Sequence, residues 1–294
     1  MEEPYSLDKY TVVIFCPLVV EMRAVFLMLD EHHQGVSWDA PGQVASYILG
    51  RIGHHNVAIA GYPEGEFGMG VSGSMASEAM RDFPKLRAGF LVGVAAGIPS
   101  STSDIRFGDV AVAVPTDDNS GIVGYDLVKV YDDKVEIKQW QNSTLSSLRT
   151  IMRKMRVTGS DFTKHLSSAI SKDPDYARPY PPLPSEDWPA HKPQRKEKDG
   201  PKVHYGAILS GNEMIKSKKR REELRDRHGG IAIEMAAAGM MTRLPVAVIR
   251  GISDFADASE NKEWQPYAAL TAAAYAKEML LNMNPLHENK APGT

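Results

Sequence analysis

Short, β-branched apolar runs alternate with helical stretches along most of the chain, and no other feature limits its possible folds as strongly. Residues 11–15 (TVVIF) form one such run, and residues 20–30 follow it with apolar side chains at helical spacing. Strands are expected at residues 11–15, 45–52, 56–61, 88–94, 109–114, 203–210, 231–234 and 246–250. Helices are expected at residues 20–30, 74–83, 142–156, 216–228, 235–242 and 266–283. The alternation predicts an α/β fold of three layers, in which helices cover both faces of a mixed, twisted sheet.

Two stretches depart from this pattern. Residues 173–202 are Pro-rich, charged and aperiodic, which predicts an exposed insertion. Residues 284–294 are polar and are expected to form a linker or a fraying end. The core between residues 10 and 283 is expected to be a single domain, because 43% of the 294 residues are hydrophobic and can fill one large core.

The composition excludes several classes of protein. A formal net charge of −3 provides no basic field for nucleic acid. No apolar run reaches the roughly 20 residues that span a bilayer, and the polar N-terminus is unlike a secretory signal. The single cysteine, Cys16, fits a reducing compartment, and nine histidines without ligand spacing predict no metal site. We therefore expect a cytoplasmic protein that binds a small molecule, without a cofactor, nucleic acid or membrane.

Ligands of open α/β sheets bind beyond the carboxyl ends of strands, so ligand-binding residues are expected directly after the predicted strands. The segment Gly93-Val94-Ala95-Ala96-Gly97 follows an apolar strand. Its small side chains would let the backbone approach a ligand, and its N–H groups could hold an oxyanion or a ribose hydroxyl. A tight turn explains the same residues equally well.

Three carboxylates occupy similar places. Asp254, just past the strand at 246–250, could perform acid–base chemistry, although Asp also caps helices and closes turns. Glu234 ends the apolar run at 231–234, where a buried charge is costly unless it binds a ligand or is paired; a salt bridge or a helix cap is the structural explanation. Glu21 opens the helix after the first strand, where acidic residues are favoured in any case. For all three carboxylates, spacing alone favours a structural role, such as a helix cap, a turn or an ion pair, over a catalytic one.

Together with Ser210-Gly211-Asn212-Glu213-Met214-Ile215, these motifs resemble, in order and spacing, the purine nucleoside phosphorylase and uridine phosphorylase superfamily. The most similar branch is that of the nucleosidases typified by methylthioadenosine/S-adenosylhomocysteine nucleosidase. The segments LGRIG at 49–53, PEGEFG at 63–68 and WQPYAA at 264–269 resemble a sub-branch found as the N-terminal effector module of NACHT or ankyrin-repeat proteins. The resemblance covers about residues 10–283. It implies an α/β/α nucleoside-phosphorylase-like fold and cleavage of a purine N-glycosidic bond.

The resemblance assigns roles to particular residues. Asp254, oriented by Ser253, falls on the acid that protonates purine N7, so that the base leaves neutral. Glu21 falls on the carboxylate that activates water to attack the anomeric carbon. The residues implied in substrate binding are Gly93, Val94 and Ala95 near the anomeric carbon, Asn212, Met214 and Ile215 around the base, and Glu234, Met235 and Ala236 at the ribose.

One position departs from the family pattern. After Glu234-Met235 the family usually carries a second glutamate, which binds the ribose hydroxyls, and here the residue is Ala236. Losing such charge-assisted hydrogen bonds should cost about 1.5–3 kcal/mol per bond. Three explanations compete: an inactivating substitution made to trap ligand, a natural protein that binds without turnover, and a substrate with a different ribose contact. We favour the first, because the rest of the site is intact.

The nucleophile is expected to be water. The first loop, Cys16-Pro17-Leu18-Val19-Val20-Glu21, lacks a Gly-Asp-Pro-x-Arg phosphate motif and carries a carboxylate, which disfavours a nearby anion. Arg23 and Arg51 leave phosphorolysis as the alternative. Members of this family pair subunits near the active site, so the resemblance also implies a homo-oligomer.

Basic residues gather in two groups, Arg178 with residues 192–202, and residues 216–221, and solvated surface charge is the expected explanation for both. The sharper alternative is a clamp for the 5′-phosphates of ATP or another adenine nucleotide. A nucleotide sensor without turnover and a scaffold domain are the two alternatives to an enzyme.

Overall fold

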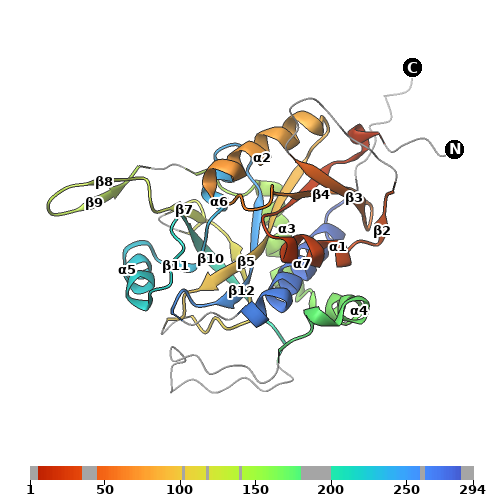
Figure 1. Cartoon of the computed structure of the whole chain (residues 1–294). Helices are drawn as coiled ribbons and strands as arrows, with labels where there is room; N and C mark the ends of the chain where they lie inside the picture. The colour runs from red at the N-terminus through yellow and green to blue at the C-terminus, as the bar shows by residue number, and fades with distance from the viewer. Residues whose placement is uncertain are drawn as a thin grey trace.

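The computed structural model describes residues 6–34, 45–100, 103–116, 119–138, 141–179, 200–258 and 262–285. In this part of the chain a ten-stranded sheet runs through the middle of the molecule (Figure 1). Its strands are β1 (Val12–Cys16), β2 (Glu31–His32), β3 (Ser46–Ile52), β4 (His55–Gly61), β5 (Ala88–Gly97), β6 (Val110–Ala113), β7 (Ile122–Gly124), β10 (Val203–Ser210), β11 (Gly230–Glu234) and β12 (Ala247–Asp254). Strands β8 (Val128–Val130) and β9 (Val135–Ile137) form a separate hairpin that projects from the body.

The strand order is β11-β10-β6-β12-β5-β1-β4-β3-β2, with β7 beside β10. Strand β1 is parallel to β4 and β5, and β5 is parallel to β12. Strand β6 is antiparallel to β12, and β11 is antiparallel to β5. The predicted mixed sheet is therefore confirmed. Because β11 pairs with both β10 and β5, the strands β11, β10, β6, β12 and β5 close into a ring.

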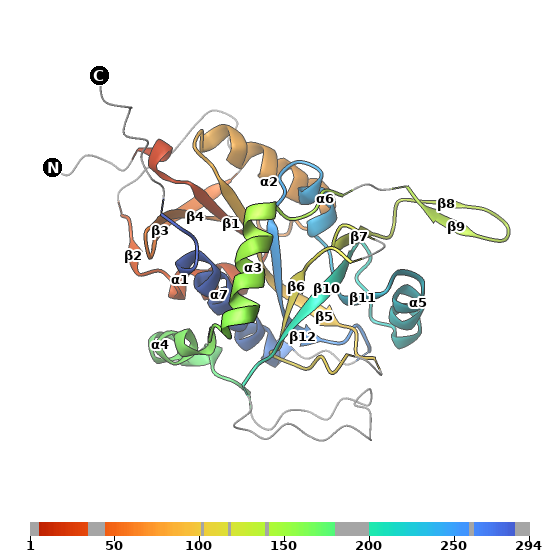
Figure 2. The same cartoon turned by 180° about the vertical axis from the view of Figure 1, so that it is seen from behind.

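Helices cover both faces of the sheet, which confirms the predicted three layers (Figures 1 and 2). On one face α1 (Val19–Leu27), α3 (Ser146–Thr158), α4 (Leu166–Lys172) and α7 (Gln265–Leu281) share a core with the strands. On the other face lie α2 (Met69–Asp82) and α6 (Ala237–Met241), while α5 (Lys218–His228) lies beside β11. Short 3-10 helices occur at η1 (Leu7–Lys9), η2 (Thr163–His165), η3 (Pro174–Tyr176) and η4 (Lys262–Trp264).

The Ala-rich helix α7 packs directly on β12 because both contribute small residues. A Cβ added at Gly251 would lie 1.8 Å from the Ala268 carbonyl oxygen, so only glycine allows the helix backbone this close to the strand. Nearly every side chain of α7 is buried, as expected for a helix that is apolar all round.

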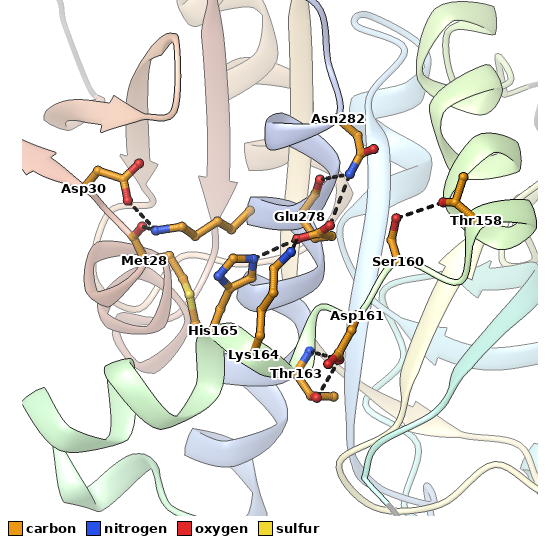
Figure 3. A network of polar contacts seen from close by, with 11 residues as sticks. Met28, Asp30, Thr158, Ser160, Asp161, Thr163, Lys164, His165, Glu278 and Asn282 are labelled. Atoms are coloured by element: carbon orange, nitrogen blue, oxygen red, sulfur yellow. Dashed lines mark hydrogen bonds and ion pairs between the residues drawn. The ribbon is translucent and has the colours of Figure 1, made fainter.

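A polar network fixes α7 against α1 and against the segment that leads into α4 (Figure 3). The buried Glu278 carboxylate accepts a hydrogen bond of 2.9 Å from His165 Nε2 and lies 2.8 Å from Lys164 Nζ. One residue earlier in α7, Lys277 Nζ donates to the carbonyl oxygen of Met28 at 2.7 Å. These contacts tie the C-terminal half of α7 to the end of α1 and to the segment before α4.

Two strands extend further than the sequence predicted. β5 continues past residue 94 to Gly97, and β12 continues past residue 250 to Asp254. The reason is mutual pairing, since Gly251 and Ile252 of β12 lie opposite Val94 and Ala95 of β5. The tight turn considered for residues 93–97 is therefore wrong.

Other differences are local. The β8–β9 hairpin and α4 were not predicted. The insertion expected from residue 173 begins later, because η3 places Tyr176 in the core at 6% exposure, with its hydroxyl donating to the Val20 carbonyl oxygen at 2.9 Å. Residues 180–199 and 286–294, on which the rest of the insertion and most of the expected tail fall, lie outside the described residues. In the described part of the chain no helix has the length and apolar character that crossing a membrane requires.

Candidate active site

The site lies along one edge of β5, between the part that pairs with β1 and the part that pairs with β11. Strand β1 pairs with β5 as far as Leu91, and β11 pairs with the same edge of β5 only from Ala96. Strands β1 and β11 lie on the same edge of β5, because β12 occupies the other edge from Leu91 to Ala96. Between Leu91 and Ala96, that first edge of β5 therefore faces a gap, which is closed by charged side chains.

Three buried charges fill this gap. Arg250, on β12, lies with its Nη1 atom 3.8 Å from Glu21 Oε1, and its Nη2 atom forms a short ion pair with Glu234 Oε2. Glu21, Arg250 and Glu234 are 2%, 2% and 5% exposed. Two carboxylates thus share one guanidinium in a region that excludes water, where each charge depends on its partners.

Glu21 is held by main-chain N–H groups from two different elements. It lies in the first turn of α1, where one carboxylate oxygen accepts the Leu18 N–H at 2.8 Å and the other accepts the Val94 N–H at 2.7 Å. Burial raises the pKa of the Glu21 carboxyl, the Arg250 charge and the two N–H donors oppose that rise, and Glu234 adds to it. The net direction is upward, so Glu21 binds a proton more readily than an ordinary glutamate does.

Gly93 makes this arrangement possible. A Cβ added there would lie 2.1 Å from Glu21 Oε1 and 2.5 Å from Arg250 Nη1. The predicted close approach to the small-residue segment is thus an approach by the protein's own charged side chains. Val94 and Ala95 continue the same strand, and Val94 is partly exposed.

Glu234 and Ala236 lie on the far side of Arg250. The Glu234 carboxylate accepts the N–H groups of Ala236 and Ala237 at 3.0 and 2.9 Å, which caps the start of α6. The ion partner and the helix cap considered from the sequence are therefore both present. Ala236 is 4% exposed and Met235 is partly buried.

Ser253 and Asp254 end strand β12, beyond Arg250. The Ser253 hydroxyl donates to Asp254 Oδ2 at 3.0 Å, and the Ala256 N–H donates to Asp254 Oδ1 at 2.9 Å. The second bond is the Asx-turn arrangement that the sequence left open, and Ala256 adopts a left-handed φ of 53° there. Asp254 remains partly exposed.

The predicted base-binding residues form a more open group. The Asn212 side-chain oxygen Oδ1 accepts the Met69 N–H at 3.1 Å at the start of α2. The main-chain N–H of Asn212 donates to Asp126 Oδ2 at 2.7 Å. Ile215 is partly buried, whereas Met214 is 65% exposed. The loop after β10 is thus tied to α2 through Asn212 and open beyond it.

Two arginines that could have held phosphate are engaged elsewhere. Arg23 Nε lies 3.0 Å from Asp173 Oδ2, and Arg51 Nη2 lies 2.7 Å from Glu31 Oε2. Of the basic residues after β10, Arg220 pairs with Glu213, also at the surface. Residues 192–199 lie outside the described residues.

Sequence reasoning missed Arg250, Asp126 and Tyr62. A signal for Arg250 was present, because a charge inside an apolar strand must have a buried partner. Asp126 contacts the site through Asn212, 86 residues later in the chain, and no local pattern announces it. Tyr62 follows β4 and donates its hydroxyl to Ser72, again without a local signal.

Comparison with known proteins adds three findings. A family model described as "Phosphorylase superfamily" matches residues 12–281. A nucleotide-binding leucine-rich repeat (NLR)-like protein of Hyaloscypha variabilis is 36% identical over 296 residues, which cover 95% of this chain and 30% of that protein. A 5′-methylthioadenosine/S-adenosylhomocysteine nucleosidase of Mycobacterium bovis is 29% identical over 85 residues, or 27% of this chain and 33% of that protein. The chain thus spans about a third of the length of these curated relatives.

Solved structures share the fold. The 5′-methylthioadenosine/S-adenosylhomocysteine nucleosidase of Neisseria meningitidis, in complex with methylthio-immucillin-A, superposes with a TM-score of 0.64 at 17% identity. The superposition covers 93% of this chain and 99% of that one. At this identity the likeness shows a shared fold and no more.

Proposed function

Because the chain belongs to the phosphorylase superfamily, we propose that it is an N-glycosidase that hydrolyses the bond between base and ribose in an adenosine-type nucleoside or nucleotide. The family expected from the sequence is confirmed by the match over residues 12–281. The observation that carries the proposal is the Glu21 carboxylate, buried in the gap along β5, held by two N–H donors and faced by Arg250.

In the proposed reaction, Glu21 takes a proton from a water molecule as that water attacks the anomeric carbon. The bond between this carbon and the purine nitrogen breaks, and Asp254 donates a proton to purine N7 so that the base departs neutral. Positive charge that develops on the ribose is stabilised by the nearby carboxylates. Ser253 holds Asp254 through the 3.0 Å hydrogen bond.

Two observations support water over phosphate as the nucleophile, one in the charged cluster and one outside it. Two carboxylates face a single guanidinium, which leaves the gap unfavourable for a further anion. The two other arginines considered for phosphate, Arg23 and Arg51, pair with surface carboxylates. Phosphorolysis is the alternative chemistry for the same site.

The finer substrate assignment is an adenine nucleotide such as ATP. It rests on the exposed lysines around the start of α5, Lys216, Lys218 and Lys219, which follow the loop assigned to the base. Their positive charge would attract the 5′-phosphates of a nucleotide.

A nucleotide sensor without turnover is the second candidate function, and Ala236 favours it. The family pattern places a ribose-binding glutamate there, whereas this chain has a buried methyl group. The relative of similar sequence is an NLR-like protein more than three times as long as the matched region, which fits a module that signals to other domains.

The decisive experiment measures base release by chromatography, with adenosine and ATP as substrates, in phosphate-free buffer. The chain and its Ala236→Glu variant are compared, and Glu21→Gln is added in the Ala236→Glu background. We expect adenine and free ribose or ribose phosphate from Ala236→Glu, no acceleration by phosphate, and a loss of about 10²–10⁴-fold for Glu21→Gln. Glu64→Gln, an exposed carboxylate on the loop after β4, is the matched control and should not change the rate.

Each other outcome points to a different function. A strict need for phosphate, with ribose 1-phosphate as product, makes the chain a phosphorylase. Silence from both proteins with ligand binding retained supports the sensor, and silence without binding leaves a scaffold.

We also propose that residues 10–283 form one domain and that this domain assembles as a homo-oligomer, by analogy with the family. Light scattering at micromolar concentration should give a multiple of the 32.3 kDa chain mass. A monomeric mass would contradict the assembly.

A further inference from the structure

Tyr62 lies next to the turn that carries Glu21. Strand β4 ends at Gly61, which pairs with Cys16 at the end of β1, and α1 begins soon after Cys16. A Cβ added at Gly61 would lie 2.8 Å from the sulfur of Met22, the neighbour of Glu21. The chain therefore passes from β4 into Tyr62 at the same end of the sheet as the charged cluster.

The Tyr62 side chain is held in one orientation. Its hydroxyl donates to Ser72 Oγ at 3.0 Å, and the Ser72 hydroxyl donates to the Gly68 carbonyl oxygen at 2.8 Å. Ser72 is fully buried on α2. Because the phenol proton is used in this chain of donors, the lone pairs of the phenol oxygen are left to accept a hydrogen bond.

The Tyr62 side chain lies on the same face of the sheet as α6, the helix that begins after Ala236. Tyr62 packs against the core cluster that includes Ala236 and Ala237. Burial raises the pKa of the Tyr62 phenol, and Arg250, Glu234 and Glu21 all act on it electrostatically. The phenol is thus neutral, oriented, and within electrostatic range of Arg250, Glu234 and Glu21.

We propose that Tyr62 is a substrate-contacting, specificity-determining residue, whose phenol oxygen accepts a hydrogen bond from a ribose hydroxyl on the side of the site where Ala236 stands. This inference rests on the proposed function. A single neutral acceptor takes the place of a two-oxygen carboxylate, so the site reads one sugar hydroxyl and tolerates the loss of the other.

The test compares adenosine with its 2′-deoxy and 3′-deoxy analogues in the chain and in Tyr62→Phe. Removing the phenol oxygen should raise KM about three- to tenfold for the substrate that carries the contacted hydroxyl, with a smaller effect on kcat. For the one deoxy analogue that lacks this hydroxyl, the two proteins should agree within about twofold. Tyr47→Phe is the matched control, because Tyr47 loses an equivalent bond, to Asp82 Oδ2 at 3.1 Å, on β3.

A second arm restores the glutamate. In the Ala236→Glu background, Tyr62→Phe should change KM by less than about twofold, since the new carboxylate takes the hydroxyl. A merely structural tyrosine would show the same loss with all three substrates and in both backgrounds. Ser72→Ala should reproduce part of the Tyr62→Phe effect, with the same preference among the analogues.

Failure of this inference is separable from failure of the proposed function. Turnover with a KM unchanged by Tyr62→Phe overturns the contact and leaves the N-glycosidase intact. If no turnover occurs, calorimetric binding of the three nucleosides to both proteins replaces KM, and the same selective loss of affinity is expected. Equal affinities, or no binding at all, overturn the inference.

Discussion

The Glu21 carboxylate accepts a hydrogen bond of 2.7 Å from the main-chain N–H of Val94, across 73 residues of sequence. This bond ties the first turn of α1 to the middle of β5. Its other oxygen accepts the Leu18 N–H, so both oxygens are fixed in position. A carboxylate held in this way can accept a proton without moving, which lowers the cost of reorganisation during general-base catalysis.

The pH dependence of catalysis should report on Glu21. Its pKa is raised, chiefly by burial, above the ordinary value of 4.5. Since the base must be ionised, kcat/KM should rise with pH and its acid limb should have a midpoint above 4.5. The profile of the Ala236→Glu protein checks this, and a limb at or below the ordinary value would remove Glu21 as the base.

Asp254→Asn, in the Ala236→Glu background, should reduce base release by about 10²–10⁴-fold while ligand binding changes little. The amide preserves the shape and can still accept from the Ala256 N–H, but it has no carboxyl proton for purine N7. Rates are measured by chromatography and affinities by calorimetry. Undiminished turnover would exclude Asp254 as the acid.

Arg250→Met should lower the free energy of unfolding by about 3–5 kcal/mol near neutral pH, because it leaves two buried carboxylates without their partner. Without the guanidinium, which lowers the pKa of Glu21, that pKa should rise further. A carboxyl with a raised folded pKa contributes stability at low pH and loses it as pH rises through that pKa. Urea titrations should therefore show the deficit shrinking in acid, and a deficit that grows in acid would contradict the cluster.

The exposed Arg243→Met is the control for Arg250, with an expected change within about 0.5 kcal/mol.

Gly93→Ala should impair both folding and activity, since the new methyl group would overlap Glu21 and Arg250. Gly70→Ala is the matched control, because its Cβ would meet nothing within 4 Å. In α2 this control should increase the free energy of unfolding by about 0.4–1 kcal/mol. Denaturant titrations of both variants provide the check, and equal stabilities would show that the gap along β5 can widen freely.

Much of the fold followed from the sequence because short apolar runs that alternate with helical stretches have few alternative folds. Strands such as β1 and β10 fill a buried sheet, and their β-branched residues identify them directly. The ends of β5 and β12 were harder, since Gly, Ala and Ser at these ends resemble loop residues. They remain in the sheet only because the two strands pair with each other, which is a tertiary effect.

The site shows the same division. Glu21 and Glu234 could be singled out because each is an isolated carboxylate beside an apolar strand. Their common partner, Arg250, depends on which strand lies between β5 and β6, and this order is not written in any local pattern. Tyr62 depends on a hydrogen bond to Ser72 on a different element.

The gap between β1 and β11 also has a consequence for hydrogen exchange. At Phe90, Leu91 and Ala96 both edges of β5 carry neighbouring strands, so amides in these parts of the strand should exchange only in rare, large openings. The Val94 amide is protected by a side-chain carboxylate instead of a strand. Its exchange rate should therefore follow the ionisation and position of Glu21. The Val94 amide proton is thus a direct reporter on the charged cluster of the site.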